Sequence, residues 1–174
     1  MEDKMSKKNY SVLECFKHRV DLKKYKDDGL LLFAVQLRYG IEDIDTLASE
    51  SLTEGGDDKK TDLLYIDKER GIALIAQAYF SRSEKHKSAK ANKASDLNTA
   101  ITLLLNAPLE KIPPDLKSHA SELRQVITDR EINSLQIWYV HNLQESKNRP
   151  VKQDNFLKSV FMFITPLPLP QLFS

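Results

Sequence analysis

The sequence predicts an α/β fold in which a central mixed β-sheet is flanked by helices. Two short apolar runs, LLYI at 63–66 and IALIA at 72–76, are joined by the polar loop KERG. This composition is typical of a β-hairpin. Both faces of the hairpin are apolar, so we expect helices on both sides of the sheet. A third β-rich run, SLQIWYVHNL at 134–143, follows a helical segment and predicts a third strand.

The segments before the hairpin have the apolar spacing of helices. We expect a helix from Tyr10 to about Lys26, and a more apolar helix over 28–39 that ends at Gly40. A short helix or turn over 43–50 should follow. The single Cys15 excludes an internal disulfide and fits a reducing, cytoplasmic setting. Its place in the apolar pattern predicts a packed core thiol.

The loop length sets the register of the hairpin. A four-residue loop pairs Asp67 with Ile72, with Gly71 in the left-handed conformation. Asp62 then lies opposite Gln77, and Tyr79 shares the face of Gln77 because side-chain direction repeats every two residues. Oxygens at the end of a covered sheet are suitable ligands for Mg²⁺. Spacing alone favours a simpler interpretation, in which Asp62 bounds the strand and Gln77 is an ordinary amide.

The region after the hairpin combines a basic segment, two helices and the third strand. The segment 81–93 has the strongest local positive charge and is a candidate phosphate-binding surface, with a solvated helix face or loop as the more common alternative. We expect helices up to Asn106 and from Pro114 to about Glu131. The third strand should be parallel to its neighbour through a right-handed crossover. His141, at its end, is expected to be structural.

Length and composition point to one domain without a membrane span. The chain has 174 residues and a formal net charge of +1, so any nucleic-acid contact must come from a local patch. We expect a disordered N-terminus over 1–9, an α/β domain over 10–145, and a linker with an apolar, proline-rich tail over 146–174. No apolar run is long enough to span a bilayer. Prolines 166, 168 and 170 exclude a helix or a central strand beyond Thr165.

The stretch GGDDKKTDLLYIDKERGIALIAQAYF, within 54–80, resembles the N-terminal nuclease-like segment of the AIPR (abortive infection phage resistance) family. That segment has a Gly-Gly pair, two aspartates four residues apart, a YID motif and a strand ending in Gln-x-Lys. The matching positions here are Gly55, Gly56, Asp58, Asp62, Tyr65, Ile66, Asp67 and Gln77. The resemblance implies a restriction-endonuclease-like fold of the PD-(D/E)xK type. AIPR proteins are much longer, so the resemblance also implies that this chain is an N-terminal fragment.

The resemblance implies a Mg²⁺-dependent nuclease site, with Asp62, Gln77 and position 79 as its catalytic residues. Its metal ligands would be Asp62 and Gln77, with Asp58 and, from the first helix, Glu14 as further candidates. The predicted nucleic-acid contacts are Arg82, Lys85, Lys87 and Lys90. Where the family has a lysine this chain has Tyr79, whose phenol carries no charge at pH 7. Either activity is lost, or another lysine substitutes; the candidates are Lys59, Lys60, Lys85 and Lys87.

Three functions follow from these observations. The first is a cytoplasmic, metal-dependent endonuclease of phage defence. The second is a non-catalytic module on the same fold that binds nucleic acid or a phage-derived partner. The third is an interaction domain that binds a protein partner, or a second copy of itself, through the apolar tail.

Overall fold

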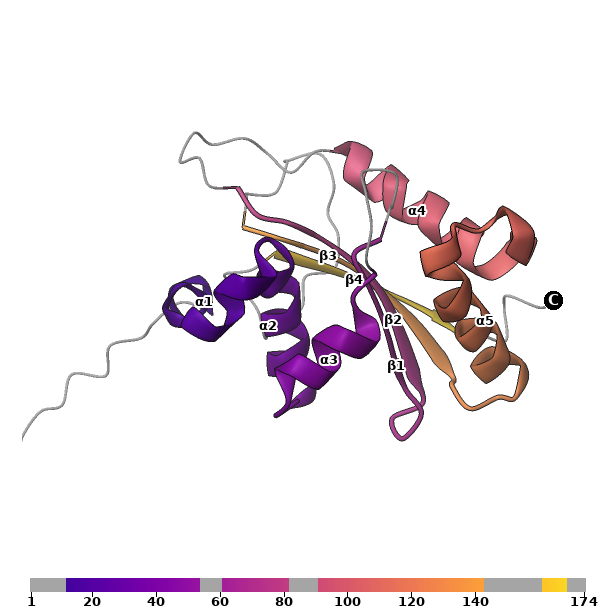
Figure 1. Ribbon diagram of the computed structural model, residues 1–174, viewed down its shortest axis with the longest axis horizontal. Coiled ribbons are helices and arrows are strands. Elements are labelled where there is room, and N and C mark those ends of the chain that lie inside the picture. Colours follow the sequence, from indigo (N-terminus) through magenta and orange to yellow (C-terminus); the bar gives the residue numbers. More distant parts are fainter. Residues whose placement is uncertain (1–11, 54–60, 82–90, 143–160, 169–174) are drawn as a thin grey trace, which may run out of the picture.

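The computed structural model describes residues 12–53, 61–81, 91–142 and 161–168, and within them it confirms the α/β class. One mixed sheet has the strand order β1-β2-β3-β4, and helices lie on both sides of it (Figure 1). The strands are β1 (Leu63–Asp67), β2 (Ile72–Tyr79), β3 (Ser134–His141) and β4 (Phe161–Pro168). The α-helices are α1 (Val12–His18), α2 (Asp28–Tyr39), α3 (Ile44–Ser51), α4 (Ala91–Asn106) and α5 (Pro114–Thr128). Two short 3₁₀ helices are η1 (Val20–Tyr25) and η2 (Leu109–Lys111).

The β1–β2 hairpin has the predicted register. Asp67 pairs with Ile72, and Gly71 closes the loop with a φ of 65°, the left-handed conformation that glycine adopts without strain. The Asp67 carboxylate accepts hydrogen bonds from the Arg70 backbone N–H at 2.9 Å and from the Arg70 guanidinium at 2.6 Å. These bonds fix the loop and therefore the register.

β3 lies parallel to β2, as the helical crossover predicted, with Gln77 paired to Tyr139 and Tyr79 paired to His141. The sequence analysis expected only three strands, and the fourth was missed. β4 pairs antiparallel to β3 and includes Pro166 and Pro168. Proline is tolerated there because β4 is an edge strand, whose outer N–H groups pair with no neighbour in the sheet.

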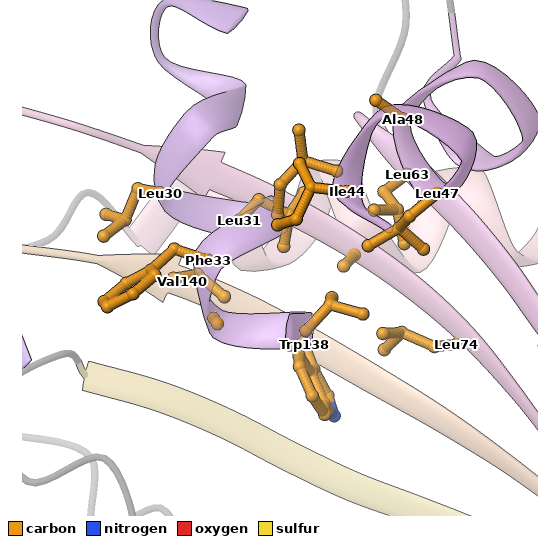
Figure 2. Packing of buried hydrophobic residues seen from close by; sticks show 14 of the residues in the cluster. Leu30, Leu31, Phe33, Ile44, Leu47, Ala48, Leu63, Leu74, Trp138 and Val140 are labelled. Atoms are coloured by element: carbon orange, nitrogen blue, oxygen red, sulfur yellow. The ribbon is translucent and has the colours of Figure 1, made fainter. Parts of the chain in front are cut away.

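Two apolar clusters fill the space between the sheet and its helices. One packs η1, α2 and α3 against β1, β2 and β3; its residues include Leu30, Phe33, Leu74, Trp138 and Val140 (Figure 2). The other packs α4 and α5 on the opposite face and includes Ile75, Leu104, Leu123, Leu135 and Ile137. Alternate residues of β2 and β3 enter opposite clusters, which explains why most residues of both strands are apolar.

The single helix expected from Tyr10 to Lys26 was wrong, because it breaks at Arg19. Arg19 has φ −78° and ψ 87°, outside the helical region, and η1 begins at the next residue. The break allows η1 to lie against α2. Gly29 of α2 is so close to η1 that a Cβ there would be 2.7 Å from the Leu22 carbonyl oxygen.

Cys15 is exposed on α1, so the prediction of a packed core thiol was also wrong. The contacts of α1 with the core come from Val12 and Phe16. The remaining helix ends are close to expectation. Gly40 caps α2 with a φ of 66°, and α5 ends at Thr128. In the described part of the chain, no helix is both long and apolar enough to cross a bilayer.

Candidate metal and phosphodiester site

Asp62 lies beside Gln77 at the end of the hairpin, as the register predicted. Asp62 immediately precedes β1, and its backbone N–H donates to the Ala76 carbonyl at 2.9 Å. Its carboxylate Oδ2 accepts from the Ala78 N–H at 2.7 Å. These two bonds join Asp62 to the residues on either side of Gln77. The charge-assisted bond to Ala78 also fixes the direction of the carboxylate.

The amide of Gln77 is buried at the same end of the sheet. The side chain has a relative exposure of 2%, and its Oε1 has no hydrogen-bond partner in the described part of the chain. A buried acceptor without a partner costs about 1–3 kcal/mol. Such a cost is commonly retained at functional sites. Amide oxygen is also a good ligand for hard divalent cations.

Asp28, at the start of α2, is the residue that sequence reasoning missed. Its pKa is raised to about 6, first by burial, then by the negative charge of Asp62 and then by that of Asp27. The fold therefore brings a carboxylate of α2 within electrostatic reach of Asp62. The only sequence signal was an aspartate pair at the start of the most apolar helix. The sequence analysis had proposed Glu14 for the early-helix acid; Glu14 is exposed on α1.

Aromatic and imidazole side chains continue the polar end of β2 and β3. Tyr79, Tyr139 and His141 share the face of Gln77, by strand alternation and by the parallel pairing. The rings of Tyr139 and His141 have centroids 5.0 Å apart, and His141 is fully buried. Burial raises the pKa of Tyr139 to about 12, with smaller contributions from Tyr79 and Asp62.

The ends of β2 and β3 are joined by one side chain. Asn142 accepts from the Ser81 N–H at 2.7 Å and donates to the Ser81 carbonyl at 2.8 Å. The two bonds hold the chain just beyond Tyr79 beside the end of β3. The position of Tyr79 relative to His141 is therefore fixed by the pairing of β2 with β3 before it and by the Asn142 side chain after it.

Several predicted site residues cannot be placed. Asp58 lies outside the described residues, and so do the basic candidates Arg82, Lys85, Lys87 and Lys90 and the alternative lysines Lys59 and Lys60. Within the described ranges, no group of three or more Asp, Glu, His or Cys side chains is placed to hold a metal ion. A cation site at this end of the sheet would rest on Asp28, Asp62 and the amide of Gln77.

The chain was compared with protein-family models, with curated proteins and with solved structures, and none of the three comparisons found a significant match.

Proposed function

We propose that this chain is a degenerate Mg²⁺-dependent, nuclease-like domain that binds nucleic acid and acts on its phosphodiester bonds slowly or not at all. The observation that carries the proposal is the electrostatic interaction between two carboxylates, Asp28 and Asp62. Asp62 lies opposite Gln77 in the register of the hairpin, and the buried Oε1 of Gln77 has no hydrogen-bond partner among the described residues. Resemblance to the PD-(D/E)xK segment of the AIPR family supports the same assignment and suggests a role in phage defence.

The donor set fits a hard divalent cation. Carboxylate and amide oxygens are the protein ligands that Mg²⁺ takes, together with several waters. A cation placed between two carboxylates whose negative charges repel one another stabilises the charged form of both. When bound, such a metal activates water and stabilises the leaving oxygen of a phosphodiester.

The chain's own residues would hold and orient the substrate. Asp62 is fixed by the Ala78 N–H, so its carboxylate keeps one direction at the sheet end. Tyr79 can donate a hydrogen bond to a phosphate oxygen, but it offers no cation to the developing charge. We therefore expect binding to exceed catalysis, unless a lysine outside the described residues reaches this end of the sheet.

The alternative, a tail that binds a protein partner, has less support. Residues 161–168 pair with β3 along eight positions. That part of the tail belongs to the sheet, which leaves less of it for a partner.

Metal binding can be measured by the rise in Tm on adding Mg²⁺ or Mn²⁺. We expect a rise for the wild type and little or none for Asp62→Asn. Gln77→Met, which keeps the volume of the side chain but removes the oxygen, should reduce the rise without lowering the Tm of the metal-free protein. Asp129→Asn, in an exposed turn after α5, is the matched control.

Cleavage is tested with the same variants on labelled DNA and RNA. Metal-dependent cutting that is abolished by Asp62→Asn would establish an active nuclease. Binding of nucleic acid without cutting would establish the degenerate, non-catalytic module. If neither cation raises the Tm of the wild type, the metal site does not exist.

A further inference from the structure

A second feature, which we name the basic pocket, lies where α1, η1 and the end of β2 meet. Its volume is about 240 Å³. Its cationic lining residues are Lys17, Arg19, Lys23 and Lys26, and its aromatic ones are Phe16 and Phe80. The sequence analysis had placed the nucleic-acid contacts elsewhere, in the segment 81–93.

Most of the positive charge at the basic pocket is not neutralised by the described residues. The Arg19 guanidinium forms an ion pair with the Asp21 carboxylate at 2.6 Å and donates a hydrogen bond to the side-chain oxygen of Gln36. Lys17, Lys23 and Lys26 are exposed and form no ion pair within the described part of the chain. Asp27 is the one acidic residue in the lining. A pocket with this charge balance attracts anions such as phosphate groups.

The backbone of Lys26, which lines the pocket, is strained. Its φ of 52° and ψ of −123° lie in a region that non-glycine residues rarely adopt. A residue held in such a conformation motivates a functional hypothesis, because a glycine would occupy it more easily. What lysine adds at this position is a cation.

The aromatic lining offers a surface for stacking. Phe16 and Phe80 are half-buried, with ring centroids 5.8 Å apart in an edge-to-face arrangement. Aromatic side chains beside a positively charged groove are the usual means of binding single-stranded nucleic acid, since every base has a face that stacks. A base paired within a duplex does not present that face.

Two stretches of the chain lead from the basic pocket to the candidate metal site. Lys26 and Asp27 line the pocket and lead directly into Asp28. Phe80 directly follows β2 and lies two residues beyond Ala78, whose N–H donates to the Asp62 carboxylate. A strand bound in the pocket would therefore have its neighbouring phosphate close to the two carboxylates.

We propose that the basic pocket binds single-stranded nucleic acid, with a base against Phe16 and Phe80 and phosphates on Lys17, Lys23 and Lys26. Binding itself needs no metal. The further statement that the bound strand leads into the Asp28–Asp62 site rests on the proposed function.

Binding is tested by fluorescence anisotropy of the full chain with a labelled single strand of about 12 nucleotides, in the range of known site sizes. EDTA is present throughout, so that failure of the metal site cannot be mistaken for failure of the pocket. The double variant Lys23→Gln, Lys26→Gly removes two cations and relieves the strained backbone. It should weaken binding at least roughly threefold and lower the slope of log affinity against log salt by about 1.4, or 0.7 for each phosphate contact.

Stacking is tested by Phe80→Leu, which keeps an apolar side chain. We expect affinity to fall roughly fivefold or more, with no change in the salt slope. The control variant, Lys111→Gln with Lys117→Gln, removes two cations from η2 and α5. It should bind as the wild type does.

The proposal is overturned if the wild type does not bind the single strand in EDTA, or if a duplex of the same sequence competes equally well. It is also overturned if the control variant loses as much affinity as the double variant. Binding without a metal-induced rise in Tm would refute the metal site and leave the pocket intact. A rise in Tm without binding would refute the pocket alone.

Discussion

The ionisation of Asp28 is coupled to folding by its position at the start of α2. Burial and the charge of Asp62 raise its pKa from 3.8 to about 6. A carboxyl group with a raised native pKa stabilises the fold when it is protonated. That contribution is fully present below about pH 3.8 and is lost as the pH rises through about 6.

We therefore expect Asp28→Asn to be more stable than the wild type at pH 7. After allowing for solvent screening of a partly exposed group, the gain in the free energy of unfolding should be about 1–2 kcal/mol. Urea unfolding at pH 4, 5, 6 and 7 measures it. The difference in the free energy of unfolding between Asp28→Asn and the wild type should be smallest at pH 4 and should increase up to about pH 6.

The control for this prediction is Asp129→Asn, whose carboxylate is exposed. Its difference from the wild type should not widen over the same range. A gap for Asp28→Asn that is constant with pH would show that Asp28 titrates normally and is not close to Asp62.

Sequence reasoning reached Asp62 and Gln77 but not Asp28, for a physical reason. The loop length and the two-residue period of strands fix which residues of a hairpin lie opposite one another. The approach of α2 to the sheet end depends instead on tertiary packing, which the sequence of α2 does not encode locally. The basic pocket was missed for the same reason, because Phe16 and Phe80 meet only in the folded chain.

Among the helices, α2 packs against η1, α3, β2 and β3. Its buried residues run from Gly29 to Val35. At its C-terminal end, the Tyr39 ring stacks on Trp138 of β3 with centroids 5.6 Å apart, and its hydroxyl donates to Gln136 at 2.8 Å. These contacts fix α2 on the sheet, and Asp28 with it.

The break between α1 and η1 was beyond sequence reasoning, because the apolar spacing continues through Arg19. What decides the break is the packing of η1 on α2 at Gly29. Leu22 of η1 is almost fully buried in this packing. The hairpin and α2 were predicted well because their composition leaves few alternatives.

We predict that Gly29→Ala lowers the free energy of unfolding by about 1–3 kcal/mol, the usual cost of overpacking a core. The new Cβ would lie 2.7 Å from the Leu22 carbonyl oxygen, a backbone atom that cannot rotate away. Because α2 must shift from η1, metal binding at Asp28 should weaken as well. Thermal unfolding with and without Mg²⁺ measures both effects.

The comparison for this variant is Gly40→Ala, at the end of the same helix. Its Cβ would meet nothing within 4 Å, so its cost comes only from the positive φ. If Gly29→Ala is no less stable than the wild type, η1 and α2 are not in the close contact described here.

At the scale of the whole molecule, the sheet separates two apolar clusters. Its strand order places the first strand, β1, and the last, β4, on opposite edges. Sequence reasoning predicted both helical layers and the parallel β2–β3 pair, since strand composition and the helical crossover determine them. β4 was not predicted because its prolines normally argue against a strand. Pairing with β3 overrides that preference at an edge.

We predict that removing residues 161–174 destabilises the whole domain. β3 would become an edge strand of eight residues with exposed backbone groups, beside the fully buried Trp138. The shortened chain should unfold at a lower temperature, by roughly 2–4 °C for each kcal/mol lost, and should aggregate more readily. Circular dichroism and light scattering measure the two effects. A shortened chain that is as stable and as monodisperse as the full chain would instead show that β4 is dispensable to the fold, and the tail would again be a candidate surface for a partner.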